Sequence, residues 1–109
     1  MSEGLNGQKV DVYESNRFSK ALARLPEKLL RLVEDEIERV IINPELGEPK
    51  KGDLNYLRVH KFQLNSQLVL LSYSWIGSKL ALYFLGLGSH ENFYQEQKRQ
   101  RKSDLKLIE

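Results

Sequence analysis

One stretch near the end of this 109-residue chain constrains the fold more than any other. Residues 80–87, LALYFLGL, are apolar at nearly every position, and successive side chains of a β-strand point to opposite faces of a sheet. A strand that is apolar on both faces belongs at the centre of a sheet. This one runs into Gly86, Gly88, Ser89 and His90. The sequence therefore predicts a buried strand that delivers a polar edge, with a histidine, to the surface.

The second half of the chain predicts three strands joined by short turns. They span residues 54–64, 67–75 and 79–87, with Asn65-Ser66 and Gly77-Ser78 between them. Turns this short join antiparallel neighbours. We therefore expect a three-stranded antiparallel meander.

The first half of the chain predicts one strand and two helices. Residues 9–14 alternate between apolar and polar, as in a short strand. Ser15 or Asn16 caps a first helix, and Pro26 suits the first turn of a second helix. The second helix has an apolar stripe and ends before Pro44, because a proline disfavours helix at the preceding residue. The fold class is thus α+β, in the order β-α-α-β-β-β, with the two helices forming a hairpin.

The length favours a single domain, which we place at residues 9–102. Residues 1–8 and 103–109 are expected to be flexible tails, and residues 92–102 a short basic helix or tail. The chain has no cysteine, its first residues are polar, and no apolar run is long enough to cross a bilayer. These features favour a cytoplasmic protein with no membrane contact.

Charge is unevenly distributed along the chain. Residues 1–48 hold 7 Lys and Arg against 10 Asp and Glu, whereas residues 49–102 hold 9 against 3. A basic half favours an anionic partner, most commonly a nucleic acid. A solvated Lys/Arg face is the alternative, and charge alone does not separate the two.

Four motifs in this order resemble the RelE/ParE toxins of bacterial type II toxin–antitoxin systems. YESNRF resembles the first strand and helix start, and GEPKKGDLNYLRV the basic turn into the second strand. QLVLLSYSW resembles the third strand, and LGLGSHENFY the last strand with its active-site end. The resemblance covers about residues 9–101. It implies an endoribonuclease that cleaves mRNA, commonly on the ribosome, and that is silenced in a complex with a cognate antitoxin; a ParE branch instead inhibits DNA gyrase by binding.

The resemblance also implies roles for particular residues. The Gly-Ser-His ending is similar to that of the histidine-containing members, so His90 falls at a catalytic position and Tyr94 at the aromatic that follows. His60 falls near a second histidine of that branch. Lys50 and Lys51 fall at the basic turn.

Two departures from the family pattern stand beside these matches. Gln67 replaces an arginine that is common in the third strand, and a carboxylate that some relatives keep has no match here. The departures weaken the case for full nuclease activity and motivate a gyrase-binding toxin as the alternative to the nuclease. A partner-binding remnant without toxicity is a third hypothesis.

RNA cleavage without a metal needs a base for the ribose 2′-OH, an acid for the departing 5′ oxygen, and cations near the phosphate. Histidine suits the first two roles and Lys or Arg the third. We therefore expect His90, His60 and Tyr94 to be catalytic and to meet at one edge of the sheet, with Arg58 and His60 on an open face. No metal or cofactor is expected, because two histidines thirty residues apart make a poor ligand set. The expected substrate-binding residues are Lys50, Lys51, Arg58, Lys61, Gln67 and Phe93.

Each assignment has a structural alternative. His90 also fits a strand end before a helix capped by Ser89, and His60 fits a half-buried strand histidine. The lysines of the basic turn also fit a solvated loop. One of Phe93 and Tyr94 is expected in the core, and the pattern does not tell which.

Overall fold

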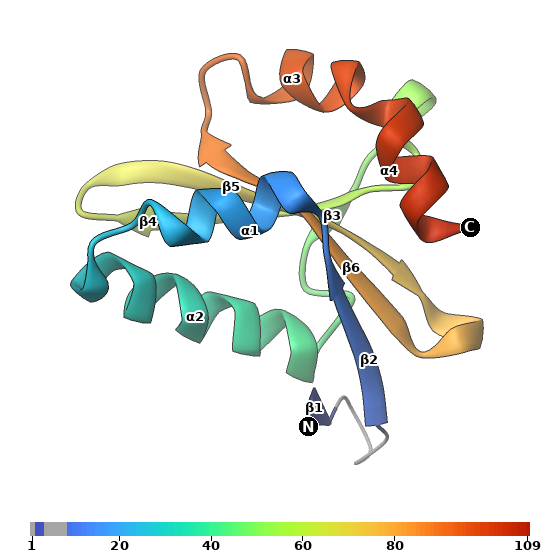
Figure 1. Cartoon of the computed structure of the whole chain (residues 1–109), viewed down its shortest axis with the longest axis horizontal. Coiled ribbons are helices and arrows are strands. Elements are labelled where there is room, and N and C mark those ends of the chain that lie inside the picture. The colour runs from blue at the N-terminus through green and yellow to red at the C-terminus, as the bar shows by residue number, and fades with distance from the viewer. Residues whose placement is uncertain (1, 4–8) are drawn as a thin grey trace.

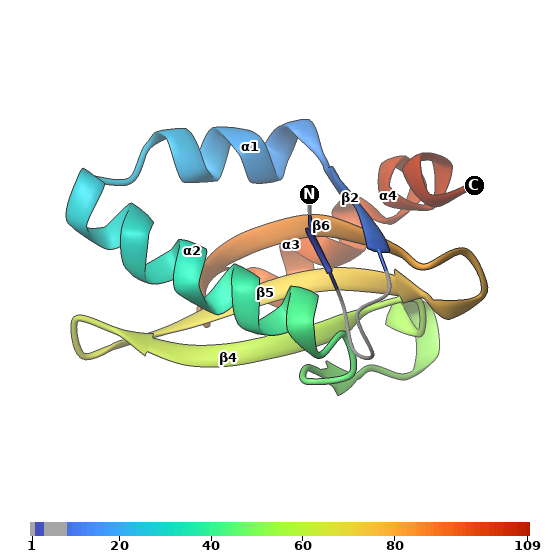
Figure 2. The ribbon, with the colours of Figure 1, turned by 90° about the horizontal axis from the view of Figure 1, so that it is seen from below.

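The computed structural model describes residues 2–3 and 9–109, and in this part of the chain a six-stranded sheet lies between two helical layers (Figures 1 and 2). Two single 3₁₀ turns, η2 and η3, interrupt the connections. The elements in chain order are β1 (Ser2–Glu3), β2 (Lys9–Glu14), α1 (Asn16–Ala23), α2 (Glu27–Ile42), β3 (Glu48–Pro49), η2 (Gly52–Leu54), β4 (Arg58–Leu64), β5 (Gln67–Ile76), η3 (Gly77–Lys79), β6 (Ala81–Ser89), α3 (Phe93–Arg99) and α4 (Arg101–Ile108).

The sheet has the strand order β1-β2-β6-β5-β4-β3. Strand β2 pairs with β6 in parallel, and the other described pairs are antiparallel. The meander β4-β5-β6 and the central position of β6 are therefore confirmed. Asn65 and Ser66 have φ angles of 50° and 67°, the left-handed conformation that a two-residue turn between twisted strands requires.

Helices α1 and α2 cover one face of the sheet. Phe18 of α1 is fully buried and stacks on Phe84 of β6, with ring centroids 5.4 Å apart. Val40 and Ile41 of α2 reach the same cluster. The helix-facing members from β5 and β6 are Leu71, Tyr73, Leu82 and Phe84, which alternate along their strands as the period of two requires.

Helices α3 and α4 cover the opposite face. Phe93 of α3 packs against Val59 of β4 and Leu70 of β5. Ile108 of α4 packs against a second cluster that contains Tyr83 and Leu85 of β6. Both faces of β6 are thus buried, which is why its sequence is apolar at nearly every position.

The predicted helix boundaries on the first face are confirmed by local hydrogen bonds. The Ser15 side chain accepts a bond from the Phe18 amide at 3.0 Å and donates one to the Leu85 carbonyl at 2.9 Å. The cap therefore also ties the start of α1 to the central strand. Helix α2 ends at Ile42, before Asn43 and Pro44.

The C-terminal segment differs from the expectation. Residues 93–99 and 101–108 form two helices, where we predicted one short helix and a loose tail from residue 103. The cause is a long-range contact, since Asp104 of α4 is buried and paired with Arg17 of α1. The expected N-terminal tail lies largely outside the described residues, which include only Ser2–Glu3 as strand β1.

Strand boundaries in the second half also differ in detail. Strand β4 begins at Arg58 rather than at residue 54, because residues 52–54 form the turn η2. A two-residue strand, β3, pairs with the start of β4 and was not predicted.

A buried polar network holds α3 and α4 to the sheet and to α1. Both Arg17 guanidinium nitrogens bond the Asp104 carboxylate, at 3.1 and 3.2 Å. Gln97 of α3 donates to Asp104 at 3.1 Å and accepts from Arg17 at 3.2 Å. Its oxygen also accepts from the Ser72 hydroxyl of β5 at 2.5 Å. Four elements therefore meet in one network of charged and neutral hydrogen bonds.

Tyr56 lies beside this network, and the network's charge affects the pKa of its phenol. Burial, followed by the Asp104 carboxylate, raises the pKa of Tyr56 to about 12. The phenol therefore stays neutral at physiological pH.

In the described part of the chain, no helix is both long enough and apolar enough to cross a bilayer.

We expect the network to exclude any side chain at Gly86. A Cβ there would lie 2.6 Å from the Gln97 oxygen and 2.8 Å from the Ser72 oxygen. Gly86→Ala should therefore lower the free energy of unfolding by about 1–3 kcal/mol, as overpacking does. Urea denaturation measures the loss.

Gly77→Ala is the matched control. A Cβ at Gly77 would meet the Trp75 ring at an ordinary 3.5 Å, so stability should change by less than about 0.5 kcal/mol. Equal stability of the two variants would show that Gly86 does not have to be a glycine.

Candidate functional site

Basic and aromatic side chains gather where β4 faces the start of α3. The Lys50 ammonium lies 5.1 Å from the centroid of the Tyr94 ring. The His90 ring meets Tyr94 edge-on, with centroids 6.4 Å apart. Lys61 stands two residues from Val59 on β4 and so shares the face that Phe93 covers. We refer to Lys50, Lys61, His90 and Tyr94 as the α3-face site.

Lys50 is held by an anchored loop. The Tyr73 hydroxyl donates to the Pro44 carbonyl at 2.7 Å and accepts from the Gly47 amide at 2.8 Å. Arg58 donates to the Gly47 carbonyl, also at 2.7 Å. Burial raises the pKa of Tyr73, which keeps its hydroxyl protonated and able to donate. The connection from α2 to β4 is thereby fixed before it reaches Lys50.

The surroundings of Lys50 favour its charged form. Partial burial alone lowers the pKa of Lys50, but a hydrogen bond to Glu48 and the neighbouring Tyr94 outweigh it, so the pKa is raised. The ammonium lies 3.0 Å from the Glu48 carboxylate, and this pairing lowers the pKa of Glu48. Lys50 is thus a permanent cation at neutral pH, suited to holding a phosphate rather than to transferring a proton.

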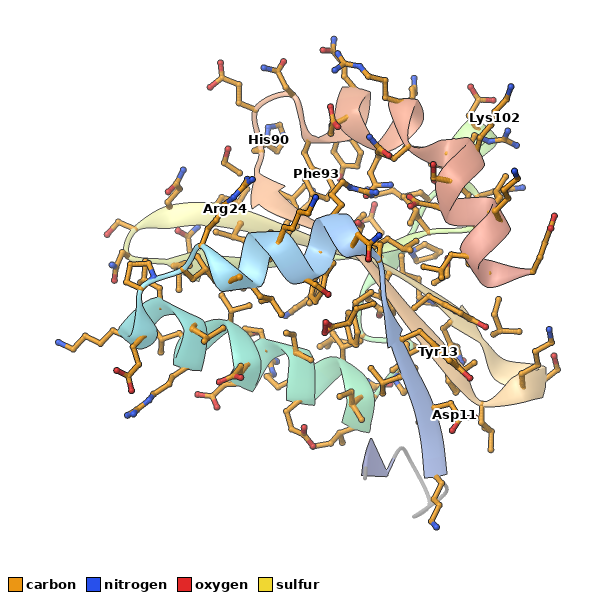
Figure 3. The ribbon with its side chains drawn as sticks, viewed as in Figure 1. Asp11, Tyr13, Arg24, His90, Phe93 and Lys102 are labelled. Carbon is orange, nitrogen blue, oxygen red and sulfur yellow. The ribbon has the colours of Figure 1, made fainter. Side chains whose placement is uncertain are left out.

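Helix α3 places the two aromatic residues differently. Phe93 is buried beneath the helix, whereas Tyr94 is half-buried and their rings meet at 88°. The core member of the pair is therefore Phe93. The Tyr94 hydroxyl is buried and has no hydrogen-bond partner among the described residues. Figure 3 shows His90 in the connection between β6 and α3, where it is exposed.

His60 lies on the other face of the sheet. Its Nε2 is 2.7 Å from a Glu36 oxygen of α2, and its ring stacks on Phe62 at 5.5 Å. The expected meeting of His60 and His90 is therefore wrong. Strand alternation did pair Arg58 with His60 on one face, but α2 covers that face, and the expected open face does not exist.

Two other expected substrate-binding residues also lie away from the α3-face site. Arg58 is occupied by the carbonyls of Glu45 and Gly47. Gln67 lines an apolar groove with Val33 of α2, on the α1–α2 side.

Among the remaining residues, Lys51 is exposed beside Lys50. The structure thus brings together Lys50, His90, Phe93 and Tyr94, with Lys51 adjacent and Lys61 on the same face of β4. It separates them from His60, Arg58 and Gln67.

No pattern in the sequence predicts the polar network that seats α3. Arg17 and Asp104 are 87 positions apart, and Gln97 and Ser72 are 25 apart. Each is an ordinary surface residue by type, so only the three-dimensional contact reveals them. Nowhere in residues 2–3 and 9–109 do three His, Cys, Asp or Glu side chains gather as metal ligands would.

Comparison with known proteins identifies the family to which this chain belongs. Residues 12–98 match the family model of the ParE-like toxin of type II bacterial toxin–antitoxin systems. The chain therefore belongs to the ParE-like toxin family, within the wider RelE/ParE group of toxins. Among curated proteins, none matches the sequence significantly.

Solved structures show the same fold at low sequence identity. A mutant of the Escherichia coli toxin RelE in the free state is 16% identical, with a TM-score of 0.64, over 85% of this chain and 96% of that one. RelBE toxin–antitoxin complexes give similar values. The E. coli complex has 18% identity and a TM-score of 0.61 over 76% and 99% of the two chains. RelBE2 from Mycobacterium tuberculosis has 16% and 0.59 over 74% and 98%.

The two histidines should differ in their effect on stability. His60→Ala empties a buried position and removes the closer partner of the Glu36 carboxylate, which keeps Arg39 at 3.0 Å. We therefore expect a loss of about 1–3 kcal/mol in the free energy of unfolding. His90→Ala removes an exposed side chain and should change it by less than about 0.5 kcal/mol. Thermal and urea denaturation of both variants measure this, and an unchanged His60→Ala protein would contradict the structural role.

Proposed function

We propose that this chain is the toxin of a toxin–antitoxin pair and cleaves mRNA at the α3-face site without a metal. The observation that carries the proposal is the grouping of Lys50, His90 and Tyr94 within one set of contacts. A cation, an imidazole and a phenol supply the three kinds of group that phosphodiester cleavage needs.

In the proposed reaction, His90 takes the proton of the ribose 2′-OH while the 2′ oxygen attacks phosphorus. The bond from phosphorus to the 5′ oxygen breaks, and Tyr94 gives its hydroxyl proton to that oxygen once RNA binding has turned the buried hydroxyl outward. The products are a 2′,3′-cyclic phosphate and a free 5′-OH. Lys50, with Lys61 and Lys51 nearby, stabilises the negative charge on the phosphate oxygens.

His60 has no place in this scheme. Its imidazole is engaged by Glu36 beneath α2, and the sheet separates it from the lysines. One histidine and one tyrosine therefore share the proton transfers in place of two histidines.

The proposed partners follow from the family. A cognate antitoxin protein would hold the toxin silent in a complex in the cytoplasm, and mRNA, on the ribosome, would be the substrate. Fold likeness to RelE supports this choice of target, together with the basic α3-face site.

We expect the purified protein to cleave mRNA and arrest synthesis in a bacterial translation extract. His90→Ala should lower the cleavage rate by about 10²–10⁴-fold, the contribution of a positioned acid–base group. Primer extension on the recovered mRNA locates and quantifies the cuts.

Lys79→Ala is the control, because Lys79 is exposed in the turn at the opposite end of β6. It should cleave as the parent does. Intact mRNA with the parent protein, or equal cleavage by His90→Ala, would rule out the proposed chemistry.

Gyrase inhibition is the second candidate. The matching family model is that of ParE-like toxins, and the structure removes His60 and Arg58 from the candidate site. Both observations favour a binding toxin with fewer acid–base groups.

A supercoiling assay separates the two targets. Under the nuclease proposal, relaxed plasmid should be supercoiled by gyrase at the same rate with and without the protein. Loss of supercoiling, with mRNA left intact in the translation extract, would support the gyrase alternative instead.

A further inference from the structure

The segment that carries Lys50 runs from one face of the sheet to the other. It leaves α2 on the face where Tyr73 is buried and forms the edge strand β3. It then brings the Lys50 ammonium to the Tyr94 ring on the α3 face, 5.1 Å from the ring centroid. A group that holds the segment on the first face therefore bears on the position of the cation on the second.

The Tyr73 hydroxyl holds the segment on the first face. It donates to the Pro44 carbonyl at 2.7 Å and accepts from the Gly47 amide at 2.8 Å. The Tyr73 side chain is fully buried in the core between β5 and the helical hairpin, so its hydroxyl is a fixed point. Both of its partners are backbone atoms, and the two bonds therefore restrain the path of the chain itself.

Gly47 lets the backbone lie directly on this tyrosine. A Cβ at Gly47 would be 2.8 Å from the Tyr73 hydroxyl oxygen, 2.9 Å from a ring carbon and 3.0 Å from the Val59 carbonyl carbon. These atoms belong to a buried ring and to a strand backbone, so they do not move aside as the end of a flexible side chain would. Any side chain at Gly47 must therefore lift the segment away from the sheet.

Only the two residues of β3 separate Gly47 from Lys50. Strand β3 pairs with the start of β4, and the Lys50 amide then donates to the Leu57 carbonyl at 3.0 Å. A strand of two residues is shorter than ordinary strands and holds its register weakly. The anchor at Gly47 therefore supplies the restraint that so short a strand lacks.

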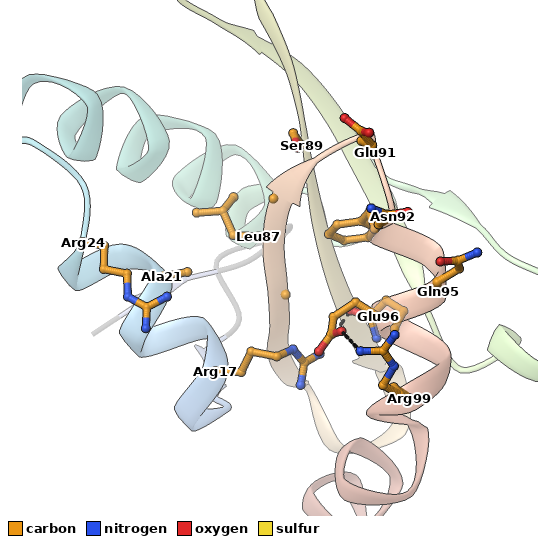
Figure 4. A pocket seen from close by; sticks show the side chains of 14 residues that line it. Arg17, Ala21, Arg24, Leu87, Ser89, Glu91, Asn92, Gln95, Glu96 and Arg99 are labelled. Carbon is orange, nitrogen blue, oxygen red and sulfur yellow. Dashed lines mark hydrogen bonds and ion pairs between the residues drawn. The ribbon is translucent and has the colours of Figure 1, made fainter.

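The aromatic side of the contact is held independently. Helix α3, which carries Tyr94, is tied through Gln97 to β5 and to Arg17 of α1. Figure 4 shows Arg17 extending from α1 toward α3 beside a pocket of about 600 Å³. Neither Tyr73 nor Gly47 is a member of this network. Loss of the Tyr73 hydroxyl should therefore move Lys50 and leave Tyr94 in place.

We propose that Tyr73 is a positioning residue for RNA cleavage. Its hydroxyl, through Gly47, sets the place of the Lys50 ammonium against Tyr94 and so aligns the cation with the phosphate. The role of the cation rests on the proposed function, whereas its placement by Tyr73 does not. A cation stabilises the charge on phosphate oxygens only from the right position, and a displacement of about 1 Å in such a site costs about a hundredfold in rate.

The position of Lys50 has a direct spectroscopic signature. Protons held over the face of an aromatic ring are shielded by its ring current, and among the described residues Lys50 is the lysine that stands over a ring. In protein labelled with ¹³C-lysine, one Cε–Hε signal should lie upfield of the others, and Lys50→Arg should remove it. Tyr73→Phe and Gly47→Ala should each move this signal toward the ordinary lysine position.

Cleavage tests whether this placement acts through the cation. Tyr73→Phe should lower the rate of mRNA cleavage about ten- to hundredfold, as measured by primer extension in the translation extract. In a protein that already carries Lys50→Ala, Tyr73→Phe should lower the rate no further. A residue that merely supports the fold would lower the rate by the same factor in both backgrounds.

Two controls separate placement of the cation from loss of a hydroxyl and from loss of stability. Tyr13→Phe makes the same chemical change at an exposed tyrosine of β2. Val33→Ala empties part of a core cluster under α2 that does not include Tyr73. Both variants, assayed below their unfolding transitions, should keep the shielded lysine signal and the cleavage rate of the parent.

Two outcomes would overturn the proposal. One is a Lys50 signal that neither Tyr73→Phe nor Gly47→Ala displaces. The other is a cleavage rate that Tyr73→Phe lowers by the same factor with and without the Lys50 side chain. If the parent protein leaves mRNA intact, the proposed nuclease fails, and the placement of Lys50 by Tyr73 is then decided by the lysine signal alone.

Discussion

The ion pair between Arg17 and Asp104 is the contact on which the placement of the C-terminal helices depends. Asp104 is almost fully buried, and breaking a buried pair by removing one partner typically costs about 3–5 kcal/mol. Gln97 and Ser72 satisfy the remaining polar atoms, which makes burial of the charge tolerable. Because α3 is seated by this network, Tyr94 comes to lie against Lys50. Arg17 near the start of the chain and Asp104 near its end therefore determine the contact between Tyr94 and Lys50.

Much of the fold could be predicted from local pattern. The doubly apolar run of β6, the caps at Ser15 and before Pro44, and the two-residue turn at Asn65 each depend on residues close together in sequence. Helix α4 could not be predicted in this way. Most of its residues are polar, and its buried Asp104 is held by Arg17, 87 positions away in the sequence.

The candidate site was predicted in part, and the error has a physical origin. Alternation along β4 correctly paired Arg58 with His60, but alternation does not say which face a helix will cover. Here helices cover both faces of the sheet. His60 lies under α2 because it binds Glu36 of that helix. Glu36 stands among several acidic residues on α2. Nothing in its local sequence marks it as the one that faces the sheet.

One short connection joins β6 to α3 and carries His90. The His90 ring meets the Tyr94 ring edge-on. Asn92, which precedes α3, has a φ of 61°, a left-handed conformation that asparagine adopts more readily than most residues. The next residue, Phe93, is buried against Val59 and Leu70. The position of His90 relative to Tyr94 therefore depends on the backbone of this turn as well as on the network that seats α3.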